Sequence, residues 1–409
     1  MVTLNCRHEQ YQHGVIVRSK VGIFLLSLTI VFSITPANAA LSAASIPAVF
    51  DELLRSSVLS NPAVVLIDST TGQVIYKKNA YSQRKPASVM KIFAGVATLK
   101  YLDPQSNFAT NISLGVQDKT LIIEGSYDPW ISLDHEVARK MKRTSLPYLG
   151  FNSLNALKRA PGGSLKKITV YYSGLYSQDV TNLKRFWAKR GFKPMMKAIS
   201  KEETLLKAGT RIVRDTSPPL YEILEFMIKW SDNNLADRLS RLSSRAAGYA
   251  FSSKGISDTF MKILADFEID SSKLAVSDAS GLSKENRITA QMIGELLYKI
   301  HKDPQYKLLY DSLPLGGVSG TLRSRFLTTA PKAVGLVRAK TGTLNGTVTL
   351  AGYVESTNGE YIFVTLADKI RRGAAANAKA RAAIDRLVGR IAAPNIPAQI
   401  SEATPTPAP

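Results

Sequence analysis

Strongly β-prone runs lie near both ends of this 409-residue chain, and a long, mainly helical middle separates them. Two runs come early, over residues 63–68 and 73–76, and the Thr71-Gly72 pair between them predicts a hairpin turn. Three come late, over residues 334–339, 347–355 and 361–367, with Asn358-Gly359 marking the last turn. These five runs can form one antiparallel sheet only if the two ends of the chain meet and the intervening helices cover it.

The middle of the chain changes character between residues 105 and 214. Helical patterns cover residues 46–59, 87–102, 220–230, 234–242, 258–267, 290–301 and 374–391. Residues 105–214 instead carry short β-prone pieces, one helical piece near 134–141, and glycine-containing loops. We therefore predict a main domain over residues 40–104 and 215–392, a smaller inserted α/β domain over 105–214, and a disordered tail rich in proline and alanine over 393–409.

The first 39 residues have the order of a secretory signal peptide. Arg18 and Lys20 precede an apolar run over residues 21–34, and small residues follow up to Ala39. We expect cleavage after Ala39 and export to the periplasm, the cell-wall space or the outside; an uncleaved anchor is the alternative, although the run is shorter than the roughly 20 residues of a membrane span. Cys6 is the only cysteine and lies in this leader, so the mature chain has no thiol and no disulfide.

The chain is strongly basic, with 53 Lys and Arg against 32 Asp and Glu and a formal net charge of +21. Removing residues 1–39 takes away Arg7, Arg18 and Lys20 against Glu9, which leaves +21 − 2 = +19. For an exported chain this charge favours an anionic cell-wall or membrane surface as partner. A solvated basic surface without a partner is the alternative, and no basic and aromatic stripe predicts nucleic-acid binding.

A serine and a lysine three residues apart open the helical pattern over residues 87–102. Ser88 and Lys91 share one helix face at this spacing, and a helix N-terminus favours an anionic intermediate. The same spacing also occurs at Ser82 with Lys85 and at Ser164 with Lys167, but those serines lie in polar or glycine-rich loops. The context, rather than the spacing, makes Ser88 the candidate nucleophile.

Two further polar groups have candidate roles. Ser231 and Asn233 stand at the head of a helical pattern, where a helix cap is the ordinary interpretation. The tetrapeptide Lys340-Thr341-Gly342-Thr343 falls between two β-prone runs, and a glycine inside a strand often marks a close approach of a ligand. Each motif alone is weak, and their combination in this order is what carries weight.

Histidine is too scarce to support a histidine-dependent serine mechanism. His8 and His13 precede the apolar run, His135 lies in an acidic stretch, and His301 ends a helical pattern. A serine must give its proton to a base, and a lysine can be that base if burial and a neighbouring positive charge lower its pKa. The sequence therefore points to serine–lysine acyl transfer without a metal or other cofactor.

With these motifs together, the chain resembles the serine penicillin-recognising enzymes, whose signature is the set S-x-x-K, S-x-N and K-T-G. It is most similar to the class C low-molecular-mass penicillin-binding proteins, which are D-alanyl-D-alanine carboxypeptidases and endopeptidases. The likeness extends to Pro86-Ala87-Ser88-Val89-Met90-Lys91, Gly125 with Asp128-Pro129, Ser217-Pro218-Pro219-Leu220, Asp278-Ala279-Ser280-Gly281-Leu282-Ser283, and Gly320-Thr321-Leu322 with Arg325. The resemblance implies a β-lactamase/transpeptidase-like fold with a five-stranded antiparallel sheet flanked by helices, plus the inserted α/β domain.

The resemblance also implies a role for each motif. Ser88 would attack a peptidoglycan stem peptide between two D-alanines, Lys91 would take its proton, Ser231 would relay a proton, and Asn233 would orient Lys91 and the substrate. Lys340, Thr341, Gly342 and Thr343 would bind the substrate, and β-lactam antibiotics would acylate Ser88. A β-lactamase, a D-amino-acid esterase and a catalytically silent wall-binding protein are the alternatives.

Two departures from the family pattern stand out. The stretch between Ser88 and Ser231 is shorter than in members with two inserted domains, and Asp368 stands where an asparagine is usual.

Overall fold

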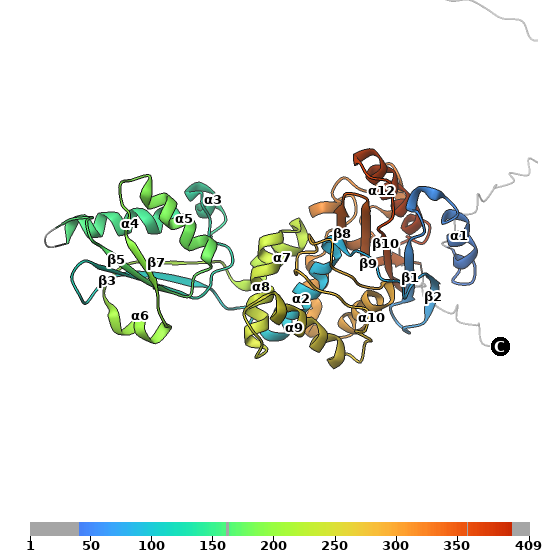
Figure 1. The fold of residues 1–409 in the computed structure, drawn as a ribbon. Helices are drawn as coiled ribbons and strands as arrows, with labels where there is room; N and C mark the ends of the chain where they lie inside the picture. Colours follow the sequence, from blue (N-terminus) through green and yellow to red (C-terminus); the bar gives the residue numbers. More distant parts are fainter. Residues whose placement is uncertain (1–40, 161–162, 358, 395–409) are drawn as a thin grey trace, which may run out of the picture. The chain divides into compact units, whose positions relative to one another are not determined.

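The computed structural model describes residues 41–160, 163–357 and 359–394 (Figure 1). The expected leader, Asn358 of the expected hairpin turn and most of the expected tail lie outside the described residues. Within these ranges, no helix has the length and apolar character needed to cross a membrane.

One antiparallel sheet combines the two ends of the chain, as the sequence predicts. Its strands are β1 (Ala63–Asp68), β2 (Val74–Lys78), β8 (Val337–Leu344), β9 (Thr347–Ser356) and β10 (Gly359–Ala367). Their order is β2-β1-β10-β9-β8, with Ala63 opposite Leu366 and Lys340 opposite Ala351. The central strand β10 joins the early hairpin to the late strands, and β8 lies at one edge.

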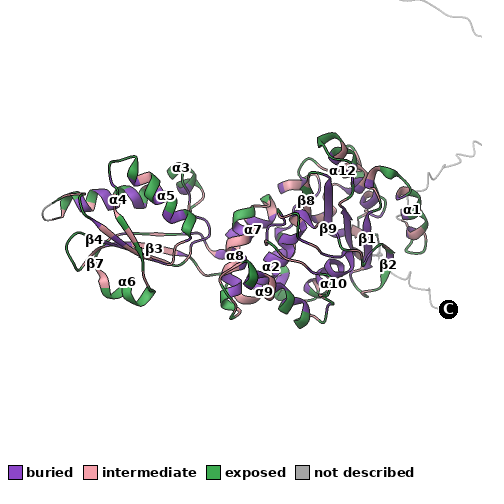
Figure 2. Ribbon diagram, in the orientation of Figure 1, coloured by how far each residue is buried: buried purple, intermediate pink, exposed green. Residues whose placement is uncertain are grey.

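Both faces of this sheet are covered by helices (Figures 1 and 2). On β1, Val65 and Ile67 belong to a core that includes helices from the middle of the chain, whereas Val64 and Leu66 belong to a second core. The first core contains residues of α2 (Lys91–Tyr101), α7 (Leu220–Trp230), α8 (Asn233–Ala246), α9 (Ser253–Asp266) and α10 (Ala290–His301). The second contains residues of α1 (Ile46–Leu53) and α12 (Ala374–Gly389). The alternation of side chains along a strand is the reason for this division.

Two predicted helices differ from the structure. The pattern over residues 46–59 divides into α1 and a 3₁₀ turn, Ser57–Leu59, because Ser56 has extended backbone and caps the second piece. The pattern over residues 87–102 likewise divides into a 3₁₀ turn, Ala87–Met90, followed by α2. Ser88 therefore lies on the 3₁₀ turn, and Lys91 is the first residue of the α-helix. Further short elements are α11 (Lys307–Ser312) and the 3₁₀ turns Pro304–Tyr306, Gly320–Leu322 and Pro331–Ala333.

The inserted segment has a second five-stranded sheet with its own core. Its elements are β3 (Ala109–Gly115), β4 (Thr120–Gly125), α3 (His135–Lys140), α4 (Leu146–Arg159), β5 (Thr169–Ser173), α5 (Ser177–Ala188), β6 (Met195–Ala198), α6 (Lys201–Lys207) and β7 (Ala208–Thr216). The order is β6-β5-β4-β3-β7, and β4, β5 and β6 run parallel. Trp187 and Phe192 are fully buried in this core. An α/β architecture agrees with the sequence prediction, although α4, α5, α6, β6 and β7 are not individually predicted.

Candidate active site

Ser88 lies on a backbone segment that is contacted from two sides. Ala87 has φ of +46°, an unusual conformation for a residue with a β-carbon. On one side, a β-carbon at Gly281 would lie 1.7 Å from the Ala87 carbonyl oxygen. On the other, a β-carbon at Gly342 would lie 2.9 Å from the Ser88 nitrogen. The two glycines therefore allow a loop and strand β8 to approach the serine at backbone distance.

Lys91 is fully buried and has three polar neighbours. Its Nζ lies 2.7 Å from Asn233 Oδ1, 2.7 Å from the Ser280 carbonyl oxygen and 3.0 Å from Ser88 Oγ. A neutral amine has two N–H donors and one lone pair, and the amide and carbonyl oxygens can only accept. When both N–H groups are donated to these oxygens, the lone pair is left for the hydroxyl of Ser88.

Burial brings the pKa of Lys91 close enough to neutrality for part of the lysine to be neutral. Burial lowers the pKa of Lys91 to about 8, and the carboxylates of Asp237, Asp232 and Asp278 oppose this shift without cancelling it. Desolvation disfavours the charged form of any buried amine. Lys91 can therefore act as a proton acceptor near neutral pH.

Lys340 is a second fully buried lysine, in the middle of strand β8. Its Nζ donates to the Thr341 carbonyl oxygen at 3.0 Å, and the Thr341 hydroxyl donates to Thr321 Oγ1 at 2.8 Å. Burial, and then the charge of Lys91, lower the pKa of Lys340 well below that of an ordinary lysine. The charge of Lys91 thus disfavours a charged Lys340, and the reverse effect of Lys340 on the base stays a prediction.

Gly342 and Thr343 complete the strand motif. A β-carbon at Gly342 would lie 2.1 Å from Thr349 Oγ1, which itself donates to the Pro86 carbonyl oxygen at 2.8 Å. Only glycine fits at this position, and Thr343 after it is exposed. Among the described residues β8 pairs within the sheet with β9, and its other edge is bridged at Arg338 by Leu315, with Ala339 N donating to the Pro314 carbonyl oxygen at 3.0 Å. An extended peptide can therefore add to this edge only beyond Ala339.

Of the Ser231 and Asn233 motif, only Asn233 contacts Lys91. Ser231 ends α7 in the left-handed conformation, with φ of +63°, and Asp232 caps α8 by accepting from the Leu235 nitrogen at 2.9 Å. Asn233 contacts Lys91 directly, but within the described ranges the hydroxyl of Ser231 makes no hydrogen bond. Hydrogen bonds therefore connect Ser88, Lys91 and Asn233, whereas Ser231, two positions before Asn233 in the sequence, is not part of this set of contacts.

Three features of the site were not predicted as such. The Ser280 carbonyl accepts from Lys91, and Asp237 accepts from the Ala279 nitrogen at 2.8 Å. Asp368 accepts from Arg84 at 3.2 Å and from the Lys85 nitrogen at 3.1 Å, which ties the end of β10 to the segment before the nucleophile. The sequence segment 278–283 was part of the family resemblance, but nothing in it identified a backbone carbonyl as a partner of the lysine.

The two described histidines lie in other contacts. His135 Nδ1 is 3.0 Å from Ser145 Oγ, and His301 Nε2 is 3.5 Å from Glu360 Oε2. Neither has a contact with Ser88 in the described part of the chain. This arrangement agrees with lysine, rather than histidine, as the base.

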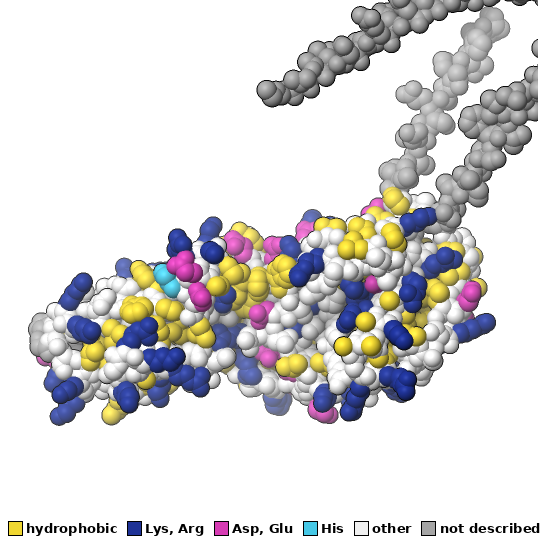
Figure 3. Space-filling model, turned by 90° about the horizontal axis from the view of Figure 1, so that it is seen from above, with side chains coloured by type: hydrophobic (Ala, Val, Ile, Leu, Met, Phe, Trp, Pro, Cys, Tyr) yellow, Lys and Arg dark blue, Asp and Glu magenta, His cyan; other side chains and the backbone are white. Residues whose placement is uncertain are grey.

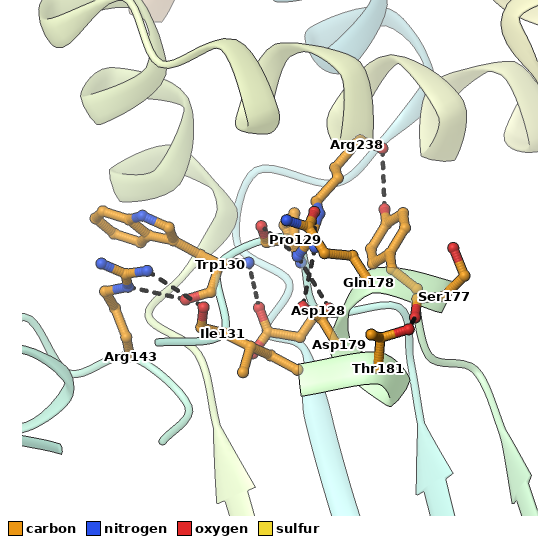
Figure 4. Close-up of polar contacts among 11 residues, drawn as sticks. Asp128, Pro129, Trp130, Ile131, Arg143, Ser177, Gln178, Asp179, Thr181 and Arg238 are labelled. Carbon is orange, nitrogen blue, oxygen red and sulfur yellow. Dashed lines mark hydrogen bonds and ion pairs between the residues drawn. The ribbon is translucent and has the colours of Figure 1, made fainter. Parts of the chain in front are cut away.

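Helix α8, which carries Asn233, is also bound by the inserted segment (Figure 4). The two terminal guanidinium nitrogens of Arg238, Nη1 and Nη2, donate to Asp179 of α5 at 3.0 and 2.9 Å, and the Tyr176 hydroxyl donates to the Arg238 carbonyl oxygen at 3.0 Å. Burial raises the pKa of Asp179, and Arg238 opposes that shift. Bidentate arginine–carboxylate pairs fix geometry as well as charge, so this contact holds α8 against the inserted segment.

Comparison with known proteins identifies the family. The D-Ala-D-Ala carboxypeptidase 3 (S13) family matches residues 48–155 and 166–391. The carboxypeptidase DacB of Mycolicibacterium smegmatis is 28% identical over 360 residues, which is 76% of this chain and 78% of that protein. The D-alanyl-D-alanine carboxypeptidase DacB of Haemophilus influenzae is 31% identical over 159 residues, 38% of this chain and 32% of that protein.

Solved structures show the same fold. The crystal structure of penicillin-binding protein 4 (dacB) from Haemophilus influenzae superposes with a TM-score of 0.63 at 19% identity, covering 83% of this chain and 97% of that one. Together with the family match over most of the chain, this confirms the resemblance inferred from the sequence. The chain belongs to the D-Ala-D-Ala carboxypeptidase 3 (S13) family and is a serine peptidase of that family.

Proposed function

We propose that the chain removes the terminal D-alanine from peptidoglycan stem peptides through an acyl-enzyme on Ser88. The single observation that carries this proposal is the surroundings of Lys91 Nζ, which lies 2.7 Å from each of two oxygens that can only accept and 3.0 Å from Ser88 Oγ. In the neutral amine, the two N–H groups serve those oxygens and the lone pair is left for Ser88. A serine with a neutral amine in this relation is an activated nucleophile.

The first half-reaction forms the acyl-enzyme. Ser88 Oγ attacks the carbonyl carbon between the two D-alanines while Lys91 Nζ takes the hydroxyl proton. The tetrahedral intermediate collapses, the C–N bond breaks, and the leaving amine receives a proton from Lys91 by way of Ser231. D-Alanine leaves, and the shortened peptide stays as an ester on Ser88.

The second half-reaction releases the peptide. Lys91, neutral again, takes a proton from water as the water attacks the ester carbonyl, and Ser88 regains its proton when the ester bond breaks. Backbone N–H groups of Ser88 and Thr343 would stabilise the oxyanion in both halves. The close approach of Gly342 to the Ser88 nitrogen supports this pairing, because it brings the two backbones together.

Lys340, with the hydroxyls of Thr341 and Thr343, would bind the terminal carboxylate of the substrate. The pKa of free Lys340 is lowered by burial and by Lys91. A substrate carboxylate would favour its charged form, and the charged Lys340 would in turn favour a neutral Lys91. Substrate binding would thereby strengthen the base.

Four further proposals concern the inhibitors, the export, the domain organisation and the surface of the enzyme. Penicillins would acylate Ser88 as substrate analogues. The protein would be exported, with residues 1–39 as the signal peptide. Residues 105–214 would form an inserted domain. Its basic surface would favour anionic wall polymers or lipid headgroups, and Lys and Arg side chains lie across much of the face seen in Figure 3.

The test uses Ser88→Ala with Ser164→Ala as the matched control, because Ser164 also has a lysine three residues later. Release of D-alanine from a stem pentapeptide and labelling by a fluorescent penicillin are measured. We expect both signals to vanish in Ser88→Ala and to persist in the control. Persistence of either signal in Ser88→Ala contradicts the proposal.

Mass analysis of purified peptidoglycan fragments tests the choice of bond. Monomers that lose one alanine indicate carboxypeptidase action. Dimers that fall to monomers without loss of alanine would instead require endopeptidase action.

A further inference from the structure

The two oxygen acceptors of Lys91 come from different parts of the chain. Asn233 is the first residue of α8. Ser280 belongs to the loop 278–283, in which the Asp278 carboxylate accepts from the nitrogens of Gly281 and Ser283, each at 2.6 Å. These bonds make the loop rigid within itself, but they do not attach it to the helix that carries Asn233.

Asp237 provides that attachment. Its Oδ1 accepts from the Ala279 nitrogen at 2.8 Å, and Ala279 immediately precedes the residue whose carbonyl binds Lys91. Asp237 lies four residues after Asn233 in α8, a spacing that puts both side chains on one face of the helix. A closed circuit therefore runs from Lys91 to Asn233, along one turn of α8 to Asp237, to the loop, and back to Lys91.

The same loop also bears on the nucleophile. Gly281 has φ of +80°, and its α-carbon approaches the Ala87 carbonyl so closely that a β-carbon could not be accommodated. A displacement of the loop would therefore move both the Ser280 acceptor and the backbone next to Ser88.

We propose that Asp237 is a positioning residue for acylation: it fixes the loop 278–283 to α8 so that both acceptors of Lys91 are held by one helix, and it keeps a carboxylate behind the lysine. This inference rests on the proposed roles of Ser88 and Lys91 and goes beyond them, because Asp237 has no direct part in either half-reaction.

The negative charge of Asp237 shifts the pKa of Lys91 in a defined direction. The charged groups that act on Lys91 are the carboxylates of Asp237, Asp232 and Asp278, which favour its protonated form. Lys340 is the neighbouring lysine, and its own pKa is lowered by burial and by the charge of Lys91. Asp237 itself also faces Arg241. Burial raises the pKa of Asp237, while the Ala279 N–H favours the ionised form. Removing this carboxylate should therefore lower the pKa of Lys91 further.

Two substitutions separate the anchor from the charge. Asp237→Asn retains an oxygen for the Ala279 N–H but removes the charge, whereas Asp237→Ala removes both. The second-order rate constant of acylation by a penicillin is measured between about pH 5 and about pH 10, which spans the shifted pKa of Lys91. Asp258→Asn is the control: this partly exposed carboxylate pairs with Lys254 on α9, and the variant should behave as wild type.

For Asp237→Asn we expect the acid limb of the profile to move to lower pH by about one unit, with the plateau nearly unchanged, as when a nearby opposite charge is removed. For Asp237→Ala we expect a plateau at least about tenfold lower, the size expected when a hydrogen bond to a charged group is lost. An Asp237→Asn limb that stays in place or moves upward overturns the proposal, as does an Asp237→Ala plateau equal to wild type.

The Asn variant decides the charge part of the proposal even if the Ala variant folds poorly, because it preserves the hydrogen bond. Thermal melting of both variants is compared with wild type for this reason. Failure of the wild-type protein to be acylated at all would contradict the proposed function instead, so the two failures are distinguishable.

Discussion

Replacing Gly281 by alanine tests whether the loop 278–283 holds the nucleophile in place. The new β-carbon would lie 1.7 Å from the Ala87 carbonyl oxygen, whereas real β-carbons essentially never come within 3.0 Å of another heavy atom. The two backbones must therefore separate by at least 3.0 − 1.7 = 1.3 Å. Both contacting groups are backbone or β-carbon, so no flexible side chain can turn away to relieve the contact.

The magnitude follows from two separate costs. A left-handed φ costs an alanine roughly 1–2 kcal/mol in stability wherever it occurs. Displacing a catalytic group by about 1 Å costs on the order of 100-fold in rate. We therefore expect Gly281→Ala to lose on the order of 100-fold in the rate of penicillin acylation, in addition to a loss of stability.

Gly248→Ala is the matched control. Gly248 has φ of +85°, close to that of Gly281, but a β-carbon there meets nothing within 4 Å. It should show the conformational cost in a urea titration and acylate at the wild-type rate. An acylation rate of Gly281→Ala within about twofold of wild type, or an equal loss in Gly248→Ala, would refute the reasoning.

Three other outcomes follow from the same structure. Because the pKa of Lys91 is lowered to about 8 and the neutral form is the base, acylation of the wild type should rise about tenfold per pH unit below about pH 8 and level off above it; a flat profile between about pH 6 and about pH 8 would contradict this. Lys340→Met should raise the melting temperature, because the lowered pKa means that protonation of Lys340 favours the unfolded chain at neutral pH. In the same variant, hydrolysis of carboxylate-terminated peptides should fall more than hydrolysis of amidated ones. Equal losses on both substrates would remove Lys340 from carboxylate binding. Arg238→Ala should lower the free energy of unfolding by about 3–5 kcal/mol, since it leaves the buried carboxylate of Asp179 unpaired; denaturant titration measures this, and the exposed Arg139→Ala should show much less.

Much of the main sheet could be predicted because its signals are local. Residues 63–68, predicted as a strand, are β1 with the same limits, and the late runs become β8, β9 and β10. Alternating apolar residues on two faces require a sheet covered on both sides. The inserted segment was harder, since β6 has four residues and α6 has seven, which are too short for a clear periodicity.

The sequence by itself also determined which residue types form the site. Motif, context and the scarcity of histidine predict Ser88, Lys91, Asn233 and Lys340 as site residues, and the comparisons confirm the family to which those motifs point. Motifs record the chemistry that a site needs, so they are readable before any fold is known. The conformation of the 3₁₀ turn that carries Ser88 could not be predicted from these motifs, because the left-handed backbone of Ala87 depends on the segments packed against it.

Only the tertiary structure decided how the base is held. Lys91 binds Asn233 across 142 residues and the Ser280 carbonyl across 189, and a backbone carbonyl has no residue type by which a sequence could reveal it. Asp237 likewise looks like any solvent-facing residue of an amphipathic helix until the loop lies against it. Local patterns depend on near neighbours in the chain, whereas the lowered pKa of a buried lysine depends on everything that packs around it.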